Sequence, residues 1–70
     1  SGRLLFMDDE ATICLMAKTL LTRLGFSVTT TPDGTAAIAA YKEAQAKGEP
    51  FRLVIMDLTV PGGMGGLEAM

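Results

Sequence analysis

Residues 4–10 read Leu4-Leu5-Phe6-Met7-Asp8-Asp9-Glu10, so an apolar run ends in three acidic side chains. A second run, Leu53-Val54-Ile55-Met56, ends in the same way at Asp57. Short runs that are apolar on both faces are typical of strands in a parallel sheet covered by helices. Side chains that follow neighbouring parallel strands meet at one edge of the sheet, where open α/β sheets bind their ligands. We therefore expect Asp8, Asp9 and Asp57 to share one crevice.

Two further segments have the spacing of amphipathic helices. Residues 11–24 and 34–47 each repeat apolar side chains every three or four positions. Gly25 is expected to end the first helix, and Asp33, in the turn before the second, is its expected N-cap. The side chains expected to face the sheet are Ile13, Met16, Ala17, Leu20, Leu21 and Leu24 in the first helix, and Ala37, Ile38, Tyr41, Ala44 and Gln45 in the second.

The order of these segments predicts an α/β fold. Strands are expected over residues 3–7, 26–30 and 52–57, with the middle one at an edge because its apolar side chains alternate with polar ones. Short connections in the order strand, helix, strand, helix, strand predict right-handed crossovers and a parallel sheet. If the chain reverses direction after the second strand, the spatial order is 2-1-3. A loop over residues 58–66 and the start of a third helix at residues 67–70 are expected to follow.

Composition excludes several classes of function. A hydrophobic share of 49% with 20% charged residues is globular, and 70 residues make one domain at most. The net charge of −2, with the Lys and Arg side chains scattered, offers no surface for nucleic acid. Cys14 is the single cysteine and is expected to be a helix-packing residue or a chance surface thiol. Without an apolar stretch near 18 residues, we expect no membrane contact by this segment and a cytoplasmic location.

The acidic residues themselves suggest a cation site. Three carboxylates in one crevice repel one another unless a cation or a proton joins them, and an oxygen-rich cluster suits Mg²⁺. The alternative is that Asp8 and Asp9 only cap the first helix while Asp57 only ends a strand. That alternative describes a non-catalytic interaction or oligomerisation fragment. Nucleotide binding is disfavoured, since no phosphate-binding loop follows the first strand.

Four stretches together resemble the receiver (response-regulator) domain of two-component signalling. They are Leu4-Leu5-Phe6-Met7-Asp8-Asp9-Glu10, Thr31-Pro32-Asp33-Gly34, Val54-Ile55-Met56-Asp57-Leu58-Thr59-Val60-Pro61 and Gly66-Leu67-Glu68. The resemblance covers residues 3–70, and residues 57–66 are similar to receivers of hybrid sensor histidine kinases. It implies the N-terminal part of a flavodoxin-like fold, with three parallel strands, two helices and the start of a third. The family's fourth and fifth strands and later helices have no counterpart in these residues.

The resemblance also implies a role for each acidic residue. Asp57 matches the phosphoacceptor, which takes a phosphoryl group from a sensor histidine kinase or a phosphotransfer domain in a phosphorelay. Asp9 matches a direct Mg²⁺ ligand and Asp8 a ligand through water, while the backbone carbonyl of Thr59 matches a further ligand. Such a domain is not a conventional enzyme by itself, and the resemblance leaves open whether the parent protein is a hybrid kinase.

Two departures from the family pattern shape the expectations. The loop after Asp57 is one residue longer than usual, and no residue matches the family's phosphoryl-binding Ser/Thr and Lys. We therefore expect impaired phosphoryl transfer by this segment and self-association through the third strand, whose edge is left open. A rival class, the Mg²⁺-dependent aspartyl phosphatases of the haloacid-dehalogenase type, needs a second aspartate where Thr59 stands.

Overall fold

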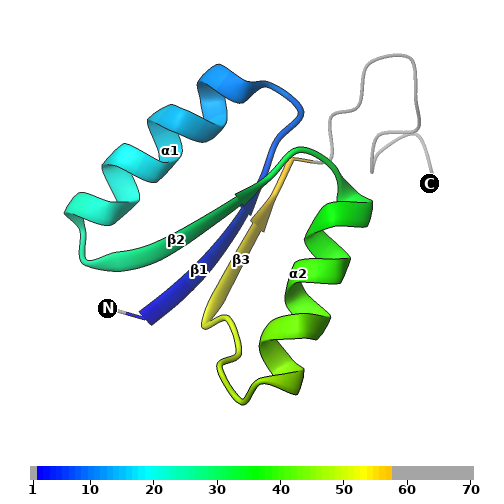
Figure 1. Ribbon diagram of the computed structural model, residues 1–70. Coiled ribbons are helices and arrows are strands. Elements are labelled where there is room, and N and C mark those ends of the chain that lie inside the picture. The colour runs from blue at the N-terminus through cyan, green and yellow to red at the C-terminus, as the bar shows by residue number, and fades with distance from the viewer. Residues whose placement is uncertain (1, 58–70) are drawn as a thin grey trace, which may run out of the picture.

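A three-stranded parallel sheet forms the centre of the molecule, with the strands in the order β2-β1-β3. The computed structural model describes residues 2–57 (Figure 1). The α/β fold class and the strand order 2-1-3 are therefore confirmed. The elements are β1 (Gly2–Met7), α1 (Ala11–Arg23), β2 (Phe26–Thr31), α2 (Gly34–Ala46) and β3 (Leu53–Met56).

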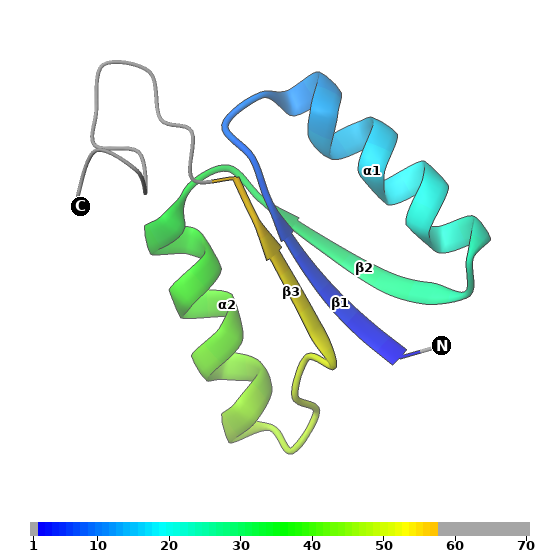
Figure 2. The same ribbon diagram turned by 180° about the vertical axis from the view of Figure 1, so that it is seen from behind.

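The two helices lie on opposite sides of the sheet, as Figures 1 and 2 show. From β1 the chain crosses to β2 on one side, and from β2 it crosses back past β1 to β3. Two right-handed crossovers in opposite directions require helices on opposite faces. In the register, Met7 lies opposite both Thr31 and Met56, so the three strands end level with one another. The residues that follow the strands consequently emerge at one edge of the sheet.

The main core lies between the sheet and α2. Leu5 and Met7 of β1 point to this side, and Leu4, which is also fully buried, points to the α1 side because side chains alternate along a strand. Phe51 belongs to this core although it precedes β3, and the guanidinium of Arg3 lies 4.6 Å from its ring centroid. The core cluster consists of Leu5, Met7, Ala37, Ala44 and Phe51, with Ala40 packed against it.

The predicted inner stripe of α1 was largely wrong. No residue of α1 is buried within the described part of the chain, because this helix covers only β1 and β2. The half-buried positions are Cys14, Ala17 and Leu21, so the face toward the sheet is rotated from the one predicted. The residues that were expected to face the sheet but are exposed are Ile13, Met16, Leu20 and Leu24 in α1, and Ile38, Tyr41 and Gln45 in α2.

The observed boundaries of the helices and strands agree with those predicted from the sequence to within one residue. Gly25 follows α1 with a φ of 101°, a left-handed conformation that glycine adopts without strain. The carboxylate of Asp33 accepts a hydrogen bond from the N–H of Ala36 at 2.8 Å, which confirms it as the N-cap of α2. The expected loop over 58–66 and helix start at 67–70 lie outside the described residues. Within residues 2–57, neither helix combines the length and the apolar character that crossing a membrane requires.

Candidate metal site at the ends of β1 and β3

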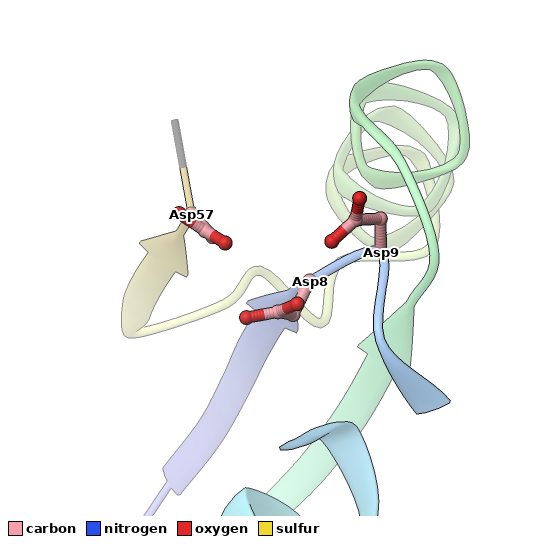
Figure 3. Close-up of side chains that lie close together, drawn as sticks. All are labelled: Asp8, Asp9 and Asp57. Atoms are coloured by element: carbon pink, nitrogen blue, oxygen red, sulfur yellow. The ribbon is translucent and has the colours of Figure 1, made fainter. Parts of the chain in front are cut away.

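Three aspartates from two strands converge at the carboxyl edge of the sheet. Asp8 and Asp9 follow β1, and Asp57 follows β3. A carboxylate oxygen from each lies within 4.8 Å of the others. Figure 3 shows the three side chains turned toward a common space, with Asp57 on one side and Asp9 on the other. The juxtaposition expected from the sequence is thus present.

The position of Asp57 depends on the pairing of β3 with β1. Its backbone N–H donates to the carbonyl oxygen of Met7 at 3.0 Å, which continues the ladder one residue beyond the strand. Met56 is the register partner of Met7. Because Met7 directly precedes Asp8, this pairing sets Asp57 beside the acidic pair. The side chain of Asp57 is half-buried, so it is supported by the sheet and reachable from solvent.

Asp8 is held on both its backbone and its side chain. Its N–H donates to the carbonyl oxygen of Thr31 at 3.1 Å, which ties the end of β1 to the end of β2. Its Oδ1 accepts a hydrogen bond from the N–H of Glu10 at 2.9 Å. Only 8% of Asp8 is exposed, whereas Asp9 is exposed. The turn therefore presents one anchored carboxylate and one that faces solvent.

The geometry does not favour a role for these aspartates as caps of α1. The N-cap residue of α1 is Glu10, whose side chain makes no cap hydrogen bond, and the first turn contains no acidic residue. Asp8 bonds to the N–H of Glu10, which lies before the first helical residue. Asp33, by contrast, is a side-chain cap, because its carboxylate accepts a hydrogen bond from an N–H group within α2.

The donor set fits a hard divalent cation. Oxygen ligands of octahedral Mg²⁺ lie about 3 to 4 Å apart, since each Mg–O bond is about 2.1 Å. The three carboxylates approach this spacing, and small rotations or an intervening water would complete it. The carbonyl of Thr59, the fourth expected ligand, lies outside the described residues.

A cavity of about 420 Å³ opens beside this cluster, between the start of α1 and the end of β2. Asp8, Asp9 and Cys14 are among its lining residues. Cys14 was expected to be a helix-packing residue or a chance surface thiol. Its thiol instead donates to the backbone carbonyl of Asp8, with Sγ 3.3 Å from that oxygen. No spacing in the sequence signals this contact, because it depends on how α1 turns away from β1.

Comparisons with known proteins agree with this architecture. A parallel sheet with helices on both faces and a site at the carboxyl ends of its strands is typical of doubly wound α/β domains. Within that class, the family model for the response regulator receiver domain matches residues 4–70. The chain belongs to the response regulator receiver domain family and is a receiver domain of two-component signalling.

Individual relatives support the assignment. Hybrid signal transduction histidine kinase I of Dictyostelium discoideum is 34% identical over 67 residues, which are 96% of this chain and 4% of that protein. DNA-binding response regulator MtrA of Mycobacterium tuberculosis (strain ATCC 25618 / H37Rv) is 35% identical over 66 residues, 94% of this chain and 26% of that protein. The chain therefore spans about a quarter or less of these relatives.

A solved structure shows the same fold. The crystal structure of a response regulator receiver domain protein from Clostridium thermocellum superposes with a TM-score of 0.77 at 28% identity. The match covers 97% of this chain and 51% of that one. The arrangement of β1, β2, β3 and the two helices is thus that of part of a receiver domain.

Proposed function

We propose that Asp57 is the phosphoacceptor of a two-component phosphorelay and that Asp8, Asp9 and Asp57 bind Mg²⁺, with the backbone carbonyl of Thr59 as a further ligand. The donor is a phosphohistidine on a sensor histidine kinase or a phosphotransfer domain. One observation carries this proposal: carboxylate oxygens of the three aspartates that follow β1 and β3 lie within 4.8 Å of one another. Family membership supports the assignment of Asp57, which follows β3.

Phosphoryl transfer requires mainly that the protein positions the reacting groups and that their negative charge is neutralised. A carboxylate oxygen of Asp57 attacks the phosphorus, the P–N bond breaks, and the departing imidazole nitrogen keeps the electron pair and takes a proton from water. Bound Mg²⁺ supplies charge neutralisation for the carboxylates and the phosphoryl oxygens. Asp8, held on its backbone and on Oδ1, keeps one carboxylate in place, while the half-buried Asp57 remains accessible to the donor.

The metal site is tested with a paramagnetic ion. Mn²⁺ takes the same octahedral oxygen ligands as Mg²⁺ and broadens the NMR signals of nearby nuclei. We expect substoichiometric Mn²⁺ to broaden the amide signals of Asp8, Asp9 and Asp57 first, and excess Mg²⁺ to restore them. Glu49, an acidic residue between α2 and β3 at the amino ends of the strands, serves as the internal control. Equal broadening at Glu49 and at the three aspartates would contradict a specific site.

Phosphoryl transfer is tested with acetyl phosphate and intact-mass measurement. One phosphoryl group adds about 80 Da. We propose that the 70-residue chain reacts slowly and incompletely, because none of its residues matches the family's phosphoryl-binding Ser/Thr and Lys. The Asp57→Asn variant should show no Mg²⁺-dependent adduct. Rapid, stoichiometric modification would contradict impairment, and an adduct that persists in Asp57→Asn would contradict the assignment of Asp57.

We also propose that copies of this chain associate through β3. In the sheet formed by residues 2–57, this strand lies at one edge, and all four of its residues are exposed. Beside it, Leu5, Val54 and Met56 line an apolar groove of about 300 Å³ together with residues of α2. An apolar edge strand is a template for pairing with another strand.

The net charge of −2 gives no support to nucleic-acid contact, and a cytoplasmic location remains a prediction.

A further inference from the structure

The thiol of Cys14 lies where three elements meet. Cys14 is in the first turn of α1 and is half-buried toward the sheet. Its Sγ–H donates to the carbonyl oxygen of Asp8, with 3.3 Å between the heavy atoms, and the carbonyl oxygen of Thr31 lies 3.8 Å from Sγ. Its N–H donates to the carbonyl oxygen of Glu10 at 3.1 Å. One residue therefore contacts the ends of β1 and β2 and the turn that carries the acidic pair.

This contact matters because the start of α1 has little other support. The N-cap Glu10 makes no side-chain hydrogen bond to the helix. The Asp8 hydrogen bonds and the bonds from Cys14 join the start of α1 to the ends of β1 and β2. Asp8 is only 8% exposed, so loss of the thiol donor removes a hydrogen bond from a largely buried residue.

We propose that Cys14 is a positioning residue of the acidic cluster. Its thiol fixes the peptide of Asp8 against α1, and thereby holds the Asp8 and Asp9 carboxylates in the arrangement that faces Asp57. The inference rests on the proposed Mg²⁺ site, and it assigns no direct contact between sulfur and the ion.

The test compares Mg²⁺ affinity among four forms of the chain, measured by calorimetry after far-UV circular dichroism has shown each to be folded. Cys14→Ala removes the donor, and we expect the dissociation constant to rise about two- to threefold, the size expected for a weak hydrogen bond. Cys14→Ser keeps a donor and should bind as the wild type does. Leu15→Ala is the matched control, because Leu15 lines the same cavity but is 67% exposed. It should leave the affinity unchanged.

A second measurement separates positioning from metal chemistry. In the absence of divalent ions, amide hydrogen exchange at Asp8, whose N–H donates to Thr31, should be faster in Cys14→Ala and unchanged in Leu15→Ala. If Cys14→Ala fails to fold, Cys14→Val, which has similar volume and no donor, takes its place.

The outcomes are distinguishable. Equal affinity in Cys14→Ala and the wild type would overturn the role of Cys14 while leaving the metal site intact. Weakening in Cys14→Ser as large as in Cys14→Ala would also overturn it, because volume and not the donor would then be responsible. Failure of the wild type to bind Mg²⁺ would remove the proposed metal site and this inference together.

Discussion

Asp57 donates its backbone N–H to the carbonyl oxygen of Met7 at 3.0 Å, so the residue that follows β3 is bonded to the residue that precedes Asp8. This hydrogen bond extends the ladder between β1 and β3, which joins parts of the chain that are distant in sequence. A slip of one residue in this pairing would turn every side chain of β3 to the other face of the sheet. The acidic cluster is therefore a property of strand register as much as of residue type.

Removal of one carboxylate should weaken metal binding without affecting the fold. We expect Asp9→Asn to raise the Mg²⁺ dissociation constant about tenfold or more, since ligand charge sets affinity at such sites. Asp9 is exposed and lies outside the core, so the circular dichroism spectrum should not change. Asp33→Asn is the charge-matched control and should bind Mg²⁺ like the wild type. Similar weakening in both variants would indicate a non-specific effect of net charge.

Mg²⁺ should stabilise the folded chain, because the cluster forms only when β1 and β3 pair. At a concentration 100 times the dissociation constant, one site contributes about 2.7 kcal/mol to the free energy of unfolding. We expect a higher Tm in Mg²⁺ than after chelation with EDTA, and a smaller difference in Asp9→Asn, because that variant binds Mg²⁺ more weakly. If Mg²⁺ did not change the Tm of the wild type, the proposed metal site would be contradicted.

The N-cap of α2 can be tested separately from the metal site. The carboxylate of Asp33 accepts a hydrogen bond from Ala36 N–H at 2.8 Å. Asp33→Ala should lower the free energy of unfolding by about 1 kcal/mol, whereas Asp33→Asn, which can still accept that bond, should cost much less. Urea unfolding measures both. Equal losses in the two variants would show that charge and not capping is responsible.

The difference in burial between Leu5 and Leu15 predicts that truncating each side chain changes the free energy of unfolding by very different amounts. Leu5 is fully buried in the core beside α2, and Leu15 is 67% exposed on α1. Leu5→Ala should cost about 2–5 kcal/mol, which is comparable with the whole stability of so small a domain. Leu15→Ala should change stability by less than about 0.5 kcal/mol. A large loss for Leu15→Ala in urea unfolding would mean that α1 is covered in solution.

A lysine placed on β3 should prevent self-association. Ile55 is exposed on this edge strand, and a charge there opposes pairing with a second chain. We expect light scattering to show association of the wild type and a monomer of about 7.4 kDa for Ile55→Lys. Ser27→Lys makes the same change of charge on β2, the opposite edge, and should still associate. A monomeric wild type at high concentration would refute the proposal.

Local patterns predicted the elements well and the helix faces less well. The α1 stripe was wrong at Ile13, Met16, Leu20 and Leu24, because periodicity shows that a helix is amphipathic but not how a neighbouring sheet limits the covered face. Phe51 was missed as a core residue, since it lies before β3 and enters the core through the turn that leads into the strand. The contact between the Arg3 guanidinium and the Phe51 ring could not be predicted from local sequence patterns either.

The amino-acid sequence by itself determined the strands, the helices, the N-cap at Asp33 and the acidic residues at two strand ends, because these follow from interactions between near neighbours in the chain. The sequence predicted that β1 and β3 are neighbours, but only the tertiary structure decided the register that sets Asp57 beside Asp8 and Asp9, and that the thiol of Cys14 meets the carbonyl of Asp8. The physical reason is that strand pairing and helix packing join groups far apart in sequence, and the burial that selects them belongs to the whole fold.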